Sequence, residues 1–300
     1  MINASSRLKI GIILLAHWAI QSGCSLFPTR QTMCSVDRPC TSGQFCNLET
    51  ATCEPALGTA DMTMDLADLS DPTPPPGMIR IPGGTFNMGS PISDTASSAD
   101  ERPEHDVTVA SFYFDITEVT QGAYRLCVNA GGCTNPDDFN VTAACNWGRS
   151  GRENHPANCI DWSQAKTYCE WRGARLPTEE EWEYAARGTR KSKYPYGDDT
   201  LAMQGCFGAG GTCAVGSYPK TLFGQINSEG INDLLANVAE WTSTVYCGDY
   251  TNQNCNGRYL TRGSNYQGAN SVTARAAARD QFISPTMRAS THGVRCAKSF

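Results

Sequence analysis

The chain has 300 residues, which is long enough for one large domain or two average ones with a sizeable core. Hydrophobic residues make up 40% and charged residues 18%, and 28 glycines and 16 prolines interrupt the chain. This composition excludes a disordered chain and a coiled coil. The formal net charge is −6 and no basic stripe is present, so we do not expect nucleic acid as a partner.

Residues 1–23 have the pattern of an export signal. Arg7 and Lys9 precede an apolar run, residues 10–20, that is too short to span a bilayer as a mature helix. Gln21 to Cys24 then resemble the cleavage box of bacterial lipoproteins, although Gln21 stands where that box usually has Leu. We expect a lipid on Cys24, which would anchor the protein at the outer membrane or cell surface. Plain secretion, with Cys24 discarded or left as a spare thiol, is the alternative.

Cysteine parity supports lipidation, because setting Cys24 aside from the 15 cysteines leaves an even number for disulfides in an oxidising compartment. After a short tether, residues 24–33, the segment 34–53 holds four cysteines and very few apolar residues. We expect a small knot held by two disulfides, whose connectivity stays open. A metal knuckle is the alternative, but the gaps of five, five and six residues are longer than the usual two to four.

Residues 54–77 form a linker between the knot and the main domain. They carry five acidic residues and no basic one, and they end in the proline-rich stretch 72–77. Such a segment repels itself and stays extended. Its spaced Met and Leu residues alternate too weakly to predict a helix.

The main domain, residues 78–300, contains few helix signals. We expect helices over about 120–129, over 163–171 and immediately after Thr178. Short strand-like runs, such as 78–81 and 107–113, are separated by Gly, Pro and Asn turns. These elements predict an α+β domain with much irregular structure.

The third helix has the clearest signal. Thr178 and Glu181 form a capping box, three successive carboxylates favour the positive end of the helix, and Gly188 is placed to end it. Trp182 and the alanine pair 185–186 then share one face.

The order of short motifs in this domain resembles the formylglycine-generating enzyme family, the sulfatase-modifying factors. The resemblance covers the whole domain and implies a compact, C-type-lectin-like α+β fold with low regular structure. It also implies the oxidation of a cysteine in a client sulfatase peptide to formylglycine with O2 and copper. The motifs that carry it are MIRIPGGTFNMGS (78–90), EHDV (104–107), DITEVT (115–120), CIDW (159–162), RLPTE (175–179), YPYG (194–197), NVAEW (237–241), RGS (262–264) and GVRC (293–296).

The copper chemistry of this family needs two thiolates after its R-G-G-S motif, because Cu(I) prefers sulfur ligands. Here residues 256–295 contain no cysteine, and the corresponding segment 266–275 offers Gln, Asn and Ser. We therefore do not expect copper, and we favour a non-catalytic ligand-binding or structural module. The alternative is an oxidase with relocated copper ligands, for which Cys247 and Cys255 are the candidate pair. A disulfide between them is favoured in an oxidising compartment.

The resemblance implies one long-range disulfide, between Cys169 and Cys296. A second family bridge falls on Ala186 and Ala276, so both partners are absent together. The remaining cysteines of the domain form near neighbours along the chain, and we expect them to pair as Cys127 with Cys133, Cys145 with Cys159, Cys206 with Cys213 and Cys247 with Cys255.

The resemblance also implies one calcium site. Its ligands would be the carboxylates of Asp233 and Glu240 and the carbonyls of Ala236 and Val238, a set of hard oxygen ligands. The alternative is that Glu240 caps or salt-bridges a loop. A second family calcium site needs an Asp within 206–213, which has none, so we expect that site to be lost.

We expect a cleft for a peptide, glycan or protein ligand. Its candidate residues are Trp241, Arg262, Asn265, Tyr266 and Arg279. Tryptophans are more often core residues than ligand platforms. Most of the late arginines are expected to pair with distant carboxylates. His105, His155 and His292 lack the spacing of a metal site and are expected to be structural.

Overall fold

The computed structural model describes residues 44–47, 52–55, 73–136, 144–198, 205–208, 210–218, 230–252, 255–268, 270–279 and 281–300. The chain divides into two compact units, Met1–Pro72 and Thr73–Phe300. The expected signal, the lipidation position Cys24 and most of the linker lie outside the described residues. In the first unit, β1 (Gln44–Asn47) pairs antiparallel with β2 (Thr52–Pro55), and the register sets Cys46 opposite Cys53.

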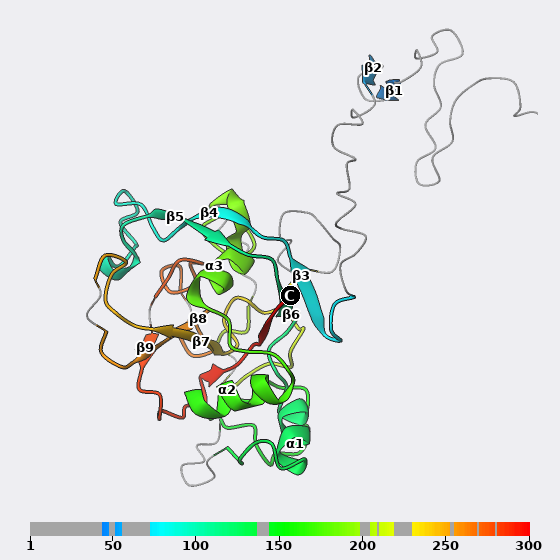
Figure 1. Cartoon of the computed structure of the whole chain (residues 1–300), viewed down its shortest axis with the longest axis vertical. Helices are drawn as coiled ribbons and strands as arrows, with labels where there is room; N and C mark the ends of the chain where they lie inside the picture. The colour runs from blue at the N-terminus through cyan, green and yellow to red at the C-terminus, as the bar shows by residue number, and fades with distance from the viewer. Residues whose placement is uncertain are drawn as a thin grey trace, which may run out of the picture. The chain divides into compact units, whose positions relative to one another are not determined.

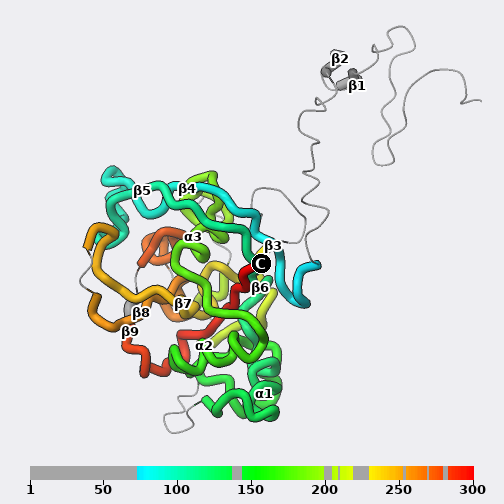
Figure 2. The backbone as a smooth tube through the Cα atoms, viewed as in Figure 1, coloured from blue at the N-terminus to red at the C-terminus, as the bar shows by residue number. Residues whose placement is uncertain are grey.

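The second unit joins its first and last strands in one three-stranded sheet (Figure 1). β6 (Phe112–Asp115) lies in the middle and pairs antiparallel with β3 (Met78–Ile81) and β11 (Ala297–Ser299). All four β6 residues are buried, as expected for a central strand covered on both faces. Figure 2 shows the cyan and red ends of this unit close together at this sheet.

A four-stranded sheet has the order β10-β7-β8-β9. β7 (Ala239–Val245) and β8 (Tyr259–Arg262) form its centre, and the edges are β9 (Gln281–Ile283) and β10 (His292–Gly293). β10 runs parallel to β7, and the other pairs are antiparallel. A separate pair consists of β4 (Gly84–Met88) and β5 (His105–Val109).

The run 107–113, expected as one strand, is divided between two sheets. β5 ends at Val109 and pairs with β4, whereas β6 begins at Phe112 and pairs with β3 and β11. Between them, the Ser111 hydroxyl accepts a hydrogen bond of 2.8 Å from Gly83 N. The apolar pattern runs on across this change of sheet, so periodicity alone does not reveal it.

The three expected helices are present within about one residue of the expected bounds. They are α1 (Gln121–Asn129), α2 (Trp162–Trp171) and α3 (Glu179–Arg187). Each begins at a side-chain cap, provided by Thr120, Asp161 and Thr178. Two short 3-10 helices, Ala99–Glu101 (η2) and Gly188–Arg190 (η4), complete the helical elements of the described part of this unit. The α+β class with low regular structure is therefore confirmed.

α3 lies in the interior and contacts β4, β5, β7 and β8. Trp182 and the pair Ala185 and Ala186 are buried in one apolar cluster with residues of β3, β4 and β6. Ala276 belongs to the same cluster, so the two alanines at which the resemblance implies a family bridge lie in one packed core. Their small side chains fill this position by packing instead of by a covalent link.

Five disulfides join all ten cysteines in the described part of the second unit. Cys169 of α2 bonds Cys296, the pair that the resemblance implies, across a sequence separation of 127. The others are the four near-neighbour pairs expected above. In the described residues, none of the helices has the length and apolar character needed to cross a bilayer.

Candidate functional site

The segment after β8 corresponds to the copper-binding segment of the resembled family. Residues 267, 268 and 270–272 are exposed in it. The Asn270 side chain accepts hydrogen bonds from Val272 N and Thr273 N, at 2.8 and 3.1 Å, and the Thr273 hydroxyl donates to Gly268 O. This is a turn held by its own side chains, with amide and hydroxyl groups instead of sulfur.

The thiolate pair that the family uses for copper is absent from the described residues of the second unit. The copper chemistry of the resembled family uses two thiolates, and every cysteine of the described second unit is already in a disulfide. Cys247 and Cys255, the candidate relocated pair, bond each other.

Asn265 and Tyr266 lie side by side but are both buried. Tyr266 N donates to Asn237 O, and Tyr266 O accepts from Gly208 N. Its hydroxyl lies 2.9 Å from the Ser290 hydroxyl. Tyr266 therefore connects the turn after β8 to the loop of the Cys206–Cys213 disulfide.

Arg262 and Arg279 meet at Glu179 in the interior. Arg262 is fully buried and donates to Glu179 at 2.9 Å and to Glu183 at 2.6 Å, while Arg279 Nε lies 2.7 Å from Glu179 Oε1. Burial raises the pKa of Glu179, and the two guanidinium groups oppose that shift. Tyr250 lies against Arg279, whose guanidinium carbon is 4.5 Å from the ring centre. The first turn of α3 therefore neutralises buried arginines as well as capping the helix.

Trp241 is fully buried in a different part of the core. Its indole donates to Ile160 O at 3.1 Å and lies 5.9 Å from the His292 ring. Burial lowers the pKa of His292 to about 4, so this histidine is neutral at pH 7. The five cleft candidates are thus all interior, and they fall into three places: Trp241 alone, Arg262 with Arg279, and Asn265 with Tyr266.

The segment expected to bind calcium bends tightly. Asp233, Ala236 and Asn237 have left-handed φ values of 57°, 68° and 56°. The Asp233 carboxylate accepts hydrogen bonds from Gly216 N and Tyr218 N. Left-handed residues reorient successive carbonyls, so this segment presents backbone oxygens in several directions.

Glu240, the second expected carboxylate ligand, is engaged elsewhere. Arg295 donates to it through Nε at 2.9 Å and through Nη2 at 2.8 Å, and the Trp182 indole donates at 2.7 Å. Both Glu240 and Arg295 are buried. The salt-bridge alternative is what the structure shows for Glu240, so this residue does not fit as a calcium ligand in this arrangement.

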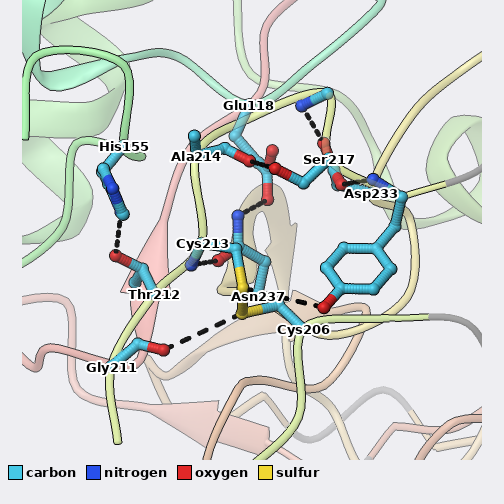
Figure 3. The surroundings of a disulfide bond; sticks show 12 residues. Glu118, His155, Cys206, Gly211, Thr212, Cys213, Ala214, Ser217, Asp233 and Asn237 are labelled. Carbon is cyan, nitrogen blue, oxygen red and sulfur yellow. Dashed lines mark hydrogen bonds between the residues drawn. A yellow bond between two sulfur atoms is a disulfide. The ribbon is translucent and has the colours of Figure 1, made fainter. Parts of the chain in front are cut away.

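Glu118 is the residue that sequence reasoning missed. It follows β6, is 1% exposed, and accepts a hydrogen bond of 2.9 Å from the Asn237 side chain on Oε1 (Figure 3). The Glu118 carboxyl also forms a side-chain hydrogen bond with the Asp233 carboxyl, which two carboxyl groups make when they share a proton. Burial and the nearby Asp233 carboxylate raise the pKa of Glu118 well above its ordinary value, and Arg295 opposes them. The only sequence signal was an acidic residue inside the motif 115–120.

Residues 66–300 match the sulfatase-modifying factor enzyme 1-like domain family. One relative is "Inactive C-alpha-formylglycine-generating enzyme 2" of Mus musculus, 34% identical over 216 residues that cover 57% of this chain and 70% of the relative. Another is "Formylglycine-generating enzyme" of Streptomyces coelicolor, 30% identical over 227 residues that cover 58% and 70%.

Solved structures agree on the fold. PvdO from Pseudomonas aeruginosa superposes with a TM-score of 0.60 at 26% identity, covering 74% of this chain and 94% of that one. Treponema denticola variable protein 1 superposes with a TM-score of 0.56 at 21% identity, over 74% and 94%, which supports the fold alone. Because the family match spans more than half of the chain, the protein belongs to the sulfatase-modifying factor enzyme 1-like domain family.

Proposed function

We propose that this protein is an exported, non-catalytic member of its family that serves as a ligand-binding or structural module, anchored to a membrane by a lipid on Cys24. One observation carries the proposal: the ten cysteines of the described second unit are all paired with each other. The family chemistry needs two thiolates close together for Cu(I). A disulfide offers none.

Two further observations support this proposal. Relatives from Mus musculus and Bos taurus carry the name of an inactive formylglycine-generating enzyme, so the family includes members without the activity. Five disulfides in one unit also favour an extracytoplasmic compartment, because cytosolic thiols are kept reduced.

The exposed turn after β8 is the proposed contact surface for a peptide, glycan or protein ligand. Gln267, Asn270 and Ser271 offer amide and hydroxyl groups, and Val272 leaves 44% of its surface exposed. Tyr266, whose hydroxyl accepts a hydrogen bond from the Gln267 side chain, would support this surface from the interior instead of touching the ligand.

The experiment is differential alkylation of the full chain followed by mass spectrometry. The protein is denatured without reductant, free thiols are blocked with one reagent, and thiols released by reduction are labelled with a second. We expect all ten cysteines from 127 to 296 to carry only the second label, and the reduced protein, the control, to accept the first label at every one of them. The same protein should bind no stoichiometric Cu(I) and consume no O2 with a cysteine-containing sulfatase-type peptide. Two free thiols in this unit together with tight copper binding would refute the proposal.

A further inference from the structure

We propose that a small pocket beside α2 binds one pyranose unit of an uncharged glycan. The pocket lies between α2, the loop that follows this helix and Ser243 of β7, and has a volume of about 170 Å³. Sites for drug-sized ligands usually measure about 300 to 1,000 Å³, so this pocket has room for a single ring. The inference rests neither on the loss of copper chemistry nor on the exposed turn after β8.

The walls of the pocket are mainly apolar. On one side, Trp162, Lys166 and Glu170 are four residues apart along α2 and therefore share one face of the helix. On the other side are Arg175 and Leu176, of which Leu176 is buried. The side chains of Lys166 and Arg175 are 44% and 35% exposed. Their aliphatic stems therefore extend the apolar wall while their charges reach the rim.

The indole of Trp162 is held in place within the protein. Its Nε1 donates to Thr242 O at 2.9 Å, and its ring stacks on Tyr259 with 4.0 Å between centroids and 22° between planes. Because Tyr259 covers one face, the remaining indole surface is what lines the pocket. A fixed aromatic surface loses little conformational entropy on binding. The negative face of an aromatic ring attracts polarised C–H groups, which a pyranose ring presents on its apolar face.

The hydroxyl groups that line the pocket are already engaged. Ser243 Oγ donates to Pro177 O at 3.1 Å, and Thr178 Oγ1 accepts from Glu181 N at 3.2 Å. Hydrogen bonds to a ligand therefore come from the charged groups at the rim.

The charges at the rim are balanced, which favours an uncharged ligand. Lys166 Nζ lies 2.5 Å from Glu170 Oε1, and Arg175 donates to Glu181 at 2.6 and 2.7 Å. A charged ligand would compete with one of these ion pairs, whereas a sugar hydroxyl would not. Among the described residues, Lys166 uses one of its three N–H donors, and the Glu170 carboxylate has further acceptor positions.

A sugar ring uses both kinds of surface in the pocket. Its hydroxyl groups donate and accept, which matches the pair of Lys166 and Glu170, and its apolar face matches Trp162 and Leu176. An apolar peptide side chain would contact the walls but leave the donors and acceptors of the rim unused. The geometry therefore favours a glycan over a peptide.

The test is titration of the full chain with the methyl pyranosides of glucose, galactose and N-acetylglucosamine, followed by saturation-transfer NMR and tryptophan fluorescence. We expect saturable binding of at least one of them with a Kd on the order of 1 mM, as for other ligands of one ring. W162A should abolish this binding. Because Trp162 also packs against the core, the double variant K166A/E170A is the second test.

The double variant removes an exposed ion pair, which contributes little to stability. It should weaken binding by about tenfold, because it removes the hydrogen bonds of the rim. R125A/E153A, which removes another half-exposed ion pair, is the matched control and should bind as wild type. Q267A, in the exposed turn after β8, should also bind as wild type.

Three results would overturn the proposal. The first is no saturable binding of any of the three pyranosides at about ten times the expected Kd. The second is binding that K166A/E170A leaves unchanged, and if Q267A abolished it, the sugar would belong to the turn after β8. The third is binding of N-acetyl-leucinamide, but of no pyranoside, that the pocket variants weaken. This pocket would then accept an apolar peptide side chain.

Discussion

Replacing Arg262 with methionine tests whether the buried arginines neutralise the carboxylates of α3. Arg262 is fully buried and donates to Glu179, to Glu183 and, at 2.7 Å, to Ala276 O. After R262M each carboxylate keeps one cation: Arg279 Nε lies 2.7 Å from Glu179, and Arg187 lies 3.0 Å from Glu183. Breaking a buried pair costs about 3 to 5 kcal/mol. The retained cations place R262M near the lower end of that range.

Arg275 provides the comparison. It donates twice to Glu101, at 2.5 and 2.6 Å, and both side chains are only 2% exposed. Among the residues that the structure describes, Arg275 is the cation that pairs with Glu101, so R275M should fall near the upper end, about 5 kcal/mol. The exposed pair Lys166 and Glu170 is the control, and K166M should cost less than about 1 kcal/mol.

The assay is equilibrium unfolding in guanidinium chloride with the disulfides intact, with the denaturant midpoint compared at constant slope. The expected order of destabilisation is R275M, then R262M, then K166M. If R262M lowered the free energy of unfolding by less than about 1 kcal/mol, Arg262 would not be needed to neutralise the buried carboxylates of α3, and the reasoning would be refuted.

Three further predictions concern other parts of the domain. Replacing Cys169 and Cys296 by serine should lower the free energy of unfolding by roughly 5 kcal/mol, because the disulfide closes a long loop in the unfolded chain. The loss should be about twice that for Cys206 and Cys213, since the sequence separations are 127 and 7, and the unfolding midpoints of the two variants check this order. His292 has a pKa of about 4 in the folded protein, below its value in the unfolded chain. Its contribution to stability is therefore complete above about pH 6.5 and is lost as the pH falls toward 4. The thermal midpoint of H292L should fall less steeply across this pH range than that of the wild type. T178A removes the cap that accepts from Glu181 N and should cost about 1 kcal/mol in urea unfolding, whereas no loss would show that α3 is fixed by packing alone.

Local features of the sequence predicted the helices well, because each helix begins directly after a capping side chain that can be recognised in the sequence. Thr178 and Glu181 are the clearest example. The near-neighbour disulfides likewise follow from short spacing along the chain. The family motifs supplied the long bridge from Cys169 to Cys296 and the fold.

Contacts between distant residues were not accessible in the same way. The partners of Arg262 and Glu240 lie far away in the sequence, and so does the Asn237 side chain that donates to Glu118. A surface cleft and a buried ion network use the same residue types, so the sequence alone does not distinguish one from the other. The difference is the burial of these residues, which depends on how the sheets pack.

The order in which the chain is made has a consequence for its folding. The short stretch 292–299 supplies β10, the guanidinium for Glu240, the sulfur for Cys169 and the edge strand β11. Each of these contacts a segment that is synthesised earlier. The earlier segments therefore complete their native contacts only after residues 292–299 have been made. If the chain is exported, its folding is completed only after translocation has delivered these late residues.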